Sequence, residues 1–205
     1  MDPDIADLSS YYEAEAAAEV RGEPTGRRVE LRDAFVQRLL RDGCSSVVDL
    51  GAGPATDGAA FADRGLHYVG LDLAIGNGHL ARRRDLTVVP GSLDRLPFRS
   101  HSFDAGYSMS ALQHIPDRLI GAVLDEIRRI LRPGAPVGIG LWGGPDDEVH
   151  GEWGKVEGRR LFRLRTDDHV RTLLGEHLGA VESFETFGDP ADTGWWYQFV
   201  TLTSR

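Results

Sequence analysis

Two carboxylates and two glycines have the types and the spacing of a small-molecule binding site at the edge of a sheet. Asp49 comes two residues before Gly51, and Gly53 completes a Gly-x-Gly loop. Such glycines allow a tight turn and let a ligand approach the backbone closely. Asp72 lies 19 residues after Gly53, close to the spacing at which a carboxylate accepts both hydroxyls of an adenosine ribose.

The same loop argues against a dinucleotide. Thr56 stands where the dinucleotide fingerprint has glycine or alanine. The charge of Asp49 would repel a diphosphate but attract an ammonium or sulfonium group, directly or through water. A ligand with a cationic amino-acid end and a ribose is therefore the simplest fit to both carboxylates.

The segments around this loop alternate between short apolar strands and helices. We expect strands at 47–50, 67–71, 86–89, 103–108 and 136–142, and helices at 55–64, 79–84 and 116–131. Alternation of this kind is typical of a parallel sheet with helices on both faces. Because ligands of such sheets bind at the carboxyl ends of the strands, the sequence predicts a doubly wound α/β core with its site at that edge.

The flanking segments predict a lead-in and a closing hairpin. Helices are expected at 13–20 and about 31–43, a polar glycine-rich loop at 143–158, a helix at 167–177, and strands at 180–187 and 195–203. The last two strands would close the sheet as an antiparallel hairpin. Alternation along the final strand predicts that one of Trp195 and Trp196 is in the core and the other on the surface.

Composition limits the kind of protein. The chain has 205 residues and a formal net charge of −9, which predicts one domain and disfavours a general nucleic-acid binder. Cys44 is the only cysteine, which fits a reducing cytosol. Asp2 and Asp4 stand where a secretory signal would carry positive charge. Because no apolar run is long enough to span a membrane, we expect a cytoplasmic protein.

Five sequence blocks, taken in order, resemble the class I S-adenosylmethionine (SAM) dependent methyltransferases, in particular the small-molecule branch. They are VVDLGAGPATDG from Val47, VGLDL from Val69, LPF from Leu96, SFDAGYSMSALQHI from Ser102 and EIRRILRPGAP from Glu126. The resemblance implies a mostly parallel seven-stranded Rossmann-like sheet ending in an antiparallel hairpin, with an N-terminal helical lid. We expect one domain over 1–205, divided into a lead-in or lid at 1–43, a cofactor-binding core at 44–142 and a substrate loop and hairpin at 143–205.

The resemblance also implies which residues contact SAM. They are Asp49, Gly51, Ala52, Gly53, Asp72, Leu73, Ser92, Leu93, Ser108 and Arg32. The glycine loop would surround the methionine end, Asp72 would hold the ribose, and Ser92 with Leu93 would contact adenine. Arg32 would meet the carboxylate of SAM, with a solvent-facing helix position as the alternative. Ser92 and Ala55 depart from the usual Asp and Gly of the family.

Acceptor binding is expected at the same edge of the sheet. The candidate acceptor-binding residues are Tyr11, Tyr12, Met109, Trp142, His150 and Trp153. His114 follows the fourth strand and is either a base for the acceptor or a packed structural histidine; we favour the structural reading. The basic residues between 155 and 171 could attract an anionic substrate, although such a run is more often a solvated face. The histidines lack zinc-ligand spacing, so we expect no metal.

The sequence therefore predicts transfer of a methyl group from SAM to a small molecule, achieved mainly by positioning the two reactants. Two alternatives remain at this stage. The fold can host a reaction that moves no methyl group, or the chain can be a catalytically silent SAM-binding subunit.

Overall fold

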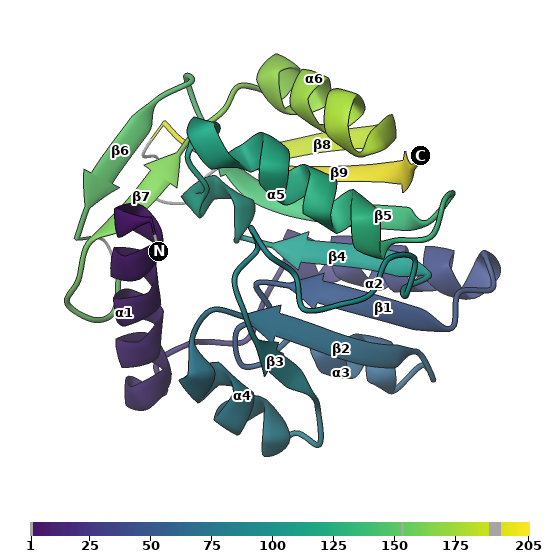
Figure 1. Cartoon of the computed structure of the whole chain (residues 1–205), viewed down its shortest axis with the longest axis horizontal. Coiled ribbons are helices and arrows are strands. Elements are labelled where there is room, and N and C mark those ends of the chain that lie inside the picture. The colour runs from purple at the N-terminus through teal and green to yellow at the C-terminus, as the bar shows by residue number, and fades with distance from the viewer. Residues whose placement is uncertain (1, 153, 189–193) are drawn as a thin grey trace.

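The computed structural model describes residues 2–152, 154–188 and 194–205. Within these residues, seven strands form one sheet in the order β3-β2-β1-β4-β5-β9-β8 (Figure 1). Their bounds are β1 (Ser46–Leu50), β2 (His67–Asp72), β3 (Val88–Pro90), β4 (Ala105–Met109), β5 (Pro136–Gly143), β8 (Gly179–Gly188) and β9 (Trp196–Ser204). Strands β1 to β5 run parallel, whereas β9 is antiparallel to both β5 and β8. This confirms the predicted Rossmann-like fold with its antiparallel end.

Helices cover both faces of the sheet. Their bounds are α2 (Arg27–Arg41), α3 (Gly58–Ala62) and α4 (Ile75–Arg82) on one face, and α5 (Asp117–Ile130) and α6 (Asp167–His177) on the other. Successive residues of a strand point to opposite faces, so Val47 packs with the α2 side and Val48 with the α5 side. Both valines are fully buried, and the two apolar clusters fix the register of β1.

Helix α1 (Pro3–Ala18) begins ten residues earlier than the predicted start of the first helix. Asp2 caps it by accepting a hydrogen bond from the Asp4 N–H (3.0 Å), and Pro3 occupies the first turn, both of which favour a helix start. Figure 1 shows α1 standing across the edge of the sheet at which β2 and β4 end. Arg118 of α5 pairs with Asp2 (2.7 Å) and with Asp4 (2.5 Å), and thus ties the start of α1 to the core.

The expected loop at 143–158 is wrong in part. Strands β6 (Glu148–Gly151) and β7 (Arg160–Arg163) form a separate antiparallel pair beside α1. Each strand has only four residues and carries charges, so neither shows a strand pattern in the sequence. Their apolar face is made by the Val149–Phe162 pair, and Phe162 is buried.

Trp195 and Trp196 also differ from expectation, because both are half-buried and only Trp196 lies in β9. The indole N–H of Trp196 donates to Asp167 (2.8 Å), which keeps that ring at the boundary of the core.

In the part of the chain that the structure describes, no helix has the length and apolar character required to cross a bilayer.

A buried cation connects the small sheet to α5. Arg165 is 1% exposed, and its Nη2 donates to Asp117 (2.9 Å) and to the Ile115 carbonyl (2.8 Å).

We predict that Asp117→Asn destabilises the fold by about 1 to 3 kcal/mol, because a charge-assisted hydrogen bond to a buried guanidinium is lost. Urea unfolding measures this. Asp125→Asn, at an exposed carboxylate of the same helix, is the control and should change stability by less than about 0.5 kcal/mol.

Candidate active site

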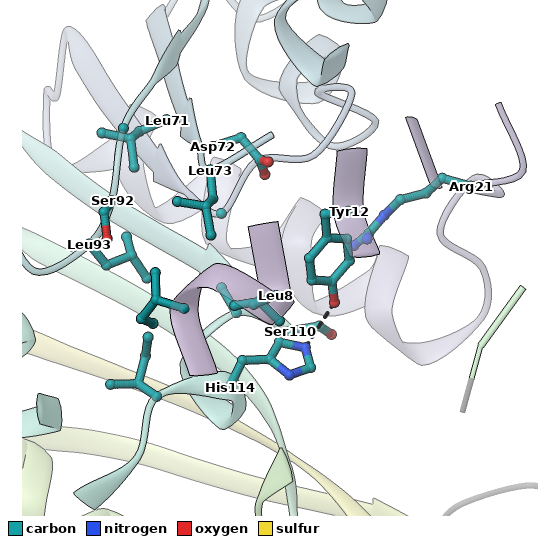
Figure 2. Close-up of a pocket in the computed structure, with 15 residues that line it drawn as sticks. Leu8, Tyr12, Arg21, Leu71, Asp72, Leu73, Ser92, Leu93, Ser110 and His114 are labelled. Atoms are coloured by element: carbon teal, nitrogen blue, oxygen red, sulfur yellow. Dashed lines mark hydrogen bonds between the residues drawn. The ribbon is translucent and has the colours of Figure 1, made fainter. Parts of the chain in front are cut away.

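A cavity opens at the carboxyl edge of the sheet, under helix α1. It holds about 560 Å³ of empty space, which includes open solvent at its mouth. One wall comes from Ile5, Leu8 and Tyr12 of α1 (Figure 2). The opposite wall comes from the ends of β2, β3 and β4 and includes Asp72, Leu73, Ser92, Leu93, Ser110, Ala111 and His114.

The glycine loop forms the floor of this cavity. Gly51 has φ +78° and Gly53 has φ +55°, a region of backbone space that favours glycine. A Cβ on Gly51 would lie 2.4 Å from the Cβ of Ala111, so no larger residue fits there without a shift. The loop therefore needs glycine at position 51 for close packing as well as for the turn.

Asp72 holds this loop in place. Its carboxylate is buried and accepts hydrogen bonds from the Gly53 N–H (2.7 Å), the Ala74 N–H (3.0 Å) and the Asn77 amide (2.9 Å). A carboxylate offers about four acceptor positions, so three donors leave room for a further one from a ligand.

A second hollow adjoins the first on the far side of the glycine loop. It is lined by Arg21, Arg28, Asp49, Gly51 and Met109 among others, and Arg21 and Gly51 line both hollows. The two hollows therefore adjoin at Arg21 and Gly51, and together they extend from Ser92 and Leu93 past Asp72 and the glycine loop to Arg28. We call this the carboxyl-edge groove.

Asp49 lies buried at the bottom of the second hollow. The Tyr68 hydroxyl donates to it (2.9 Å), but burial, followed by the nearby charge of Asp57, raises the pKa of the Asp49 carboxyl to about 8. Burial without a full counter-charge disfavours the ionised form. A cationic ligand group in the hollow would supply that counter-charge.

Arg28 provides the opposite charge in the same hollow. Its guanidinium lies over the Tyr197 ring, 5.1 Å from the centroid. Among the described residues, the buried Nε of Arg28 has no hydrogen-bond partner. An unpaired buried donor is costly, so this nitrogen suits a ligand carboxylate.

Most of the predicted cofactor residues come together in this groove. The residues that line it are Asp49, Gly51, Ala52, Asp72, Leu73, Ser92 and Leu93. Gly53 is not among the lining residues, but its N–H donates to Asp72. Two lie elsewhere. The Ser108 hydroxyl donates to the Leu50 carbonyl (2.8 Å) and links β4 to β1. Arg32 pairs with Asp33 (2.8 Å) and Asp57 (3.1 Å).

Arg28 and Arg21, which were not predicted as cofactor contacts, line the second hollow, whereas Arg32 is not among its lining residues. Arg28 lies one helical turn before Arg32 on α2, and a spacing of four residues puts both on the same face of the helix. That spacing was the available signal. Arg21 lies between α1 and α2, pairs with Glu15 (3.1 Å) and reaches over Gly53; its loop position gave no such signal.

The predicted acceptor residues divide in the same way. Tyr12 lines the groove below α1, and Met109 lines its second hollow. Tyr11 is turned away: it is buried, accepts the Lys155 N–H (3.2 Å) and stacks on Arg160 at 4.2 Å.

Three further acceptor candidates are not in the groove. Trp142 packs edge-on against Tyr197 on the α2 face, with ring centroids 5.3 Å apart. His150 contacts Asp4 at the surface, with Nε2 3.1 Å from the carboxylate. Trp153 lies outside the described residues.

His114 is buried and locked by its contacts. Its Nδ1 lies 2.7 Å from the Leu161 carbonyl, and its Nε2 lies 2.8 Å from the Tyr12 hydroxyl and 3.2 Å from the Gln113 amide nitrogen. Burial lowers the pKa of His114 to about 3, so the ring is neutral at physiological pH. These contacts favour the structural reading of His114.

Known methyltransferases resemble this chain in sequence and in fold. The sequence profile of a methyltransferase domain family matches residues 47–134. A demethylmenaquinone methyltransferase of Mycobacterium sp. (strain KMS) is 38% identical over 88 residues, which are 43% of this chain and 37% of that protein. An uncharacterized methyltransferase of Mycolicibacterium gilvum is 36% identical over 161 residues, 73% of this chain and 62% of that protein. The chain thus spans less than two thirds of the length of either relative.

A solved structure covers nearly the whole chain. The 1,6-didemethyltoxoflavin-N1-methyltransferase of Burkholderia thailandensis, with 1,6-didemethyltoxoflavin and S-adenosylhomocysteine bound, superimposes with a TM-score of 0.76 at 21% identity, over 97% of this chain and 88% of that one. The profile over residues 47–134, the sequence relatives and the fold agree, and together they support a class I SAM-dependent methyltransferase domain.

The carboxyl-edge groove fits the methionine end of SAM on two observations of this structure. Asp49 lacks a full counter-charge, and Arg28 has a buried donor with no partner among the described residues. SAM carries an ammonium and a carboxylate within one small end, and so complements both.

The pKa of Asp49 predicts a pH-dependent affinity for SAM. Below about pH 8 the carboxyl of the free protein holds a proton, which it must release to pair with an ammonium. Between pH 6 and 7.5, affinity should therefore rise with pH, by at most about tenfold per unit. Calorimetric titration in buffers of different ionisation enthalpy measures the proton released. Asp49→Asn should bind more weakly and lose the pH dependence.

The same residue predicts an opposite effect on stability. The folded pKa of Asp49 lies above its ordinary value of 3.8, so the folded chain holds a proton that the unfolded chain has lost. The stability contributed by this proton is full below about pH 4 and lost as pH rises to about 8. Without ligand, Asp49→Asn should therefore melt higher than the parent at pH 8. An unchanged or lower melting temperature would contradict the burial of Asp49 in a place that lacks a counter-charge.

Proposed function

We propose that this protein transfers the methyl group of SAM to a small-molecule acceptor. One observation carries the proposal: buried Asp49, buried Asp72 and Arg28, whose Nε has no hydrogen-bond partner among the described residues, line two adjoining hollows at the carboxyl edge of the sheet. Bound SAM supplies a methyl group that is attached to a positively charged sulfur. When the methyl group is transferred, this sulfur is the leaving group and becomes a neutral thioether.

The residues along the groove divide the binding of SAM between them. Arg28 receives the carboxylate and Asp49 the ammonium group, which places the two charges of the methionine end on opposite charges. Asp72 accepts one ribose hydroxyl while it continues to hold Gly53. Ser92 and Leu93 lie beside the adenine, with Leu8 of α1 covering it from the other side.

The chain's contribution to the reaction is to position reactants and exclude water. Methyl transfer is an in-line displacement that requires the acceptor atom about 3 to 3.5 Å from the methyl carbon. Ile5 and Leu8 close the groove with apolar surface, which strengthens the charge contacts inside it. The acceptor enters between Tyr12, Ser110 and His114, next to the glycine loop.

A small acceptor fits the charge and the enclosure of the groove. The net charge of −9 opposes a nucleic acid as acceptor, and Ile5, Leu8 and Tyr12 of α1 line one wall of the groove. The single cysteine fits a cytoplasmic location. The named reactions of the sequence relatives modify small molecules, which agrees with this proposal.

Cofactor binding provides the first test. SAM at 100 times its Kd should stabilise the fold by about 2.7 kcal/mol, because it binds only the folded chain, and NAD should not.

Asp72→Asn should weaken SAM binding at least about tenfold, since one charged acceptor is lost to the ribose and to Gly53. Asp63→Asn, at an exposed carboxylate after α3, is the matched control. If Asp72→Asn folds normally and binds SAM like the parent, the ribose lies elsewhere.

Turnover provides the second test. We expect S-adenosylhomocysteine to form when the protein and SAM are incubated with a panel of phenols, amines and carboxylic acids. Tight SAM binding with no turnover of any panel member would favour the silent-subunit alternative.

A further inference from the structure

The hydroxyl of Tyr12 has a fixed hydrogen-bond direction. The Leu161 carbonyl can only accept, so the Nδ1 of His114, 2.7 Å away, must carry the proton. The burial of the ring keeps it neutral, which leaves Nε2 as an acceptor only. The Tyr12 hydroxyl, 2.8 Å from Nε2, must therefore donate its proton to His114.

This direction decides what Tyr12 offers to the groove. Its proton is committed, and its oxygen accepts one N–H from Arg160 at 3.3 Å. A phenol oxygen can accept a second hydrogen bond. Tyr12 lines the groove together with Gly51 and Ser110, which follow β1 and β4, and the binding of SAM proposed above brings the methyl group to this part of the groove.

We propose that the methyl acceptor is a neutral amine nitrogen whose N–H donates to the Tyr12 oxygen, with His114 as the residue that positions Tyr12. This inference rests on the methyl transfer proposed above and names its acceptor class.

The charges around Tyr12 favour an amine over a hydroxyl. A hydroxyl needs a base to take its proton as it attacks, and the Tyr12–His114 pair ends on a backbone carbonyl rather than a carboxylate. The guanidiniums of Arg21, paired with Glu15, and of Arg160 lie near the Tyr12 ring. Two cations disfavour an ammonium acceptor and keep the amine neutral.

A neutral amine needs no base in the bond-forming step. Its lone pair forms the N–C bond while the C–S bond breaks and leaves its electron pair on sulfur. The positive charge thereby moves from sulfur to nitrogen, and the methylated ammonium loses one proton to water after it leaves the groove. The hydrogen bond to Tyr12 directs the lone pair at the methyl carbon during this step.

A matched set of probes tests the acceptor class. We would follow S-adenosylhomocysteine formation with aniline, N-methylaniline, N,N-dimethylaniline and phenol at pH 7.5. Aniline and N-methylaniline should be methylated, and the other two, which lack a neutral N–H, should react at least about tenfold more slowly. In Tyr12→Phe, kcat/KM for aniline should fall about ten- to a hundredfold with the Kd of SAM unchanged. Tyr11→Phe, which removes a hydroxyl outside the groove, should keep the parent's kcat/KM.

The state of His114 is tested without any acceptor. Nitrogen-15 NMR of the histidine rings should find His114 in the Nδ1–H form with no titration between pH 5 and 8. Its Nε2 resonance should shift in Tyr12→Phe, because the donated proton is lost, and should not shift in Tyr11→Phe.

Several results would overturn the inference. The first is an Nε2–H form of His114, or its titration near neutrality. The second is a kcat/KM for aniline in Tyr12→Phe that equals the value of the parent protein. The third is faster turnover of phenol or N,N-dimethylaniline than of aniline. In the last case methyl transfer itself still stands. Binding of SAM with no turnover of any probe would count against the proposed reaction, and against this inference with it.

Discussion

The carboxylate of Asp72 holds together the edge on which the whole site is built. It ties the glycine loop after β1 to the start of α4 through the N–H groups of Gly53 and Ala74 and the amide of Asn77. A buried carboxylate is stable only with such donors. The residue that would bind the ribose therefore also fixes the turn that approaches the ligand. Loss of Asp72 would affect loop geometry and cofactor contact together.

Helix α1 completes the site from outside the α/β core. It adds Ile5, Leu8 and Tyr12 to the groove, and exposed ion pairs at its ends add little to its stability. The contact that matters most in its middle is Tyr12 to His114, which in turn holds the Leu161 carbonyl of β7. The lead-in, the loop after β4 and the small sheet are thus joined at the point where an acceptor would enter.

Much of the α/β core was predictable, because its signals are local. The strand before Asp49 and the helix between Pro116 and Leu131 follow directly from apolar runs and periodicity. The β6–β7 pair was missed because each strand is four residues long. The identity of the arginine in the groove was also missed: the four-residue spacing puts Arg28 and Arg32 on the same face of α2, and which of the two reaches the groove depends on how α2 is placed along the sheet, which local pattern does not specify. Tyr11 and Tyr12 are neighbours in the sequence, but Tyr12 lines the groove and Tyr11 contacts Lys155 and Arg160. This difference depends on how α1 packs, which local pattern does not specify either.

We propose that the carboxyl-edge groove, from Ser92 to Arg28, holds the cofactor against two buried carboxylates. A crystal structure of the protein with S-adenosylhomocysteine bound tests this most directly. We predict a ribose hydroxyl on Asp72, the amino group near Asp49, the carboxylate on Arg28 and the sulfur next to Tyr12 and Ser110. A ligand whose ribose lies away from Asp72, or whose carboxylate is bound by Arg32 in place of Arg28, would contradict the account.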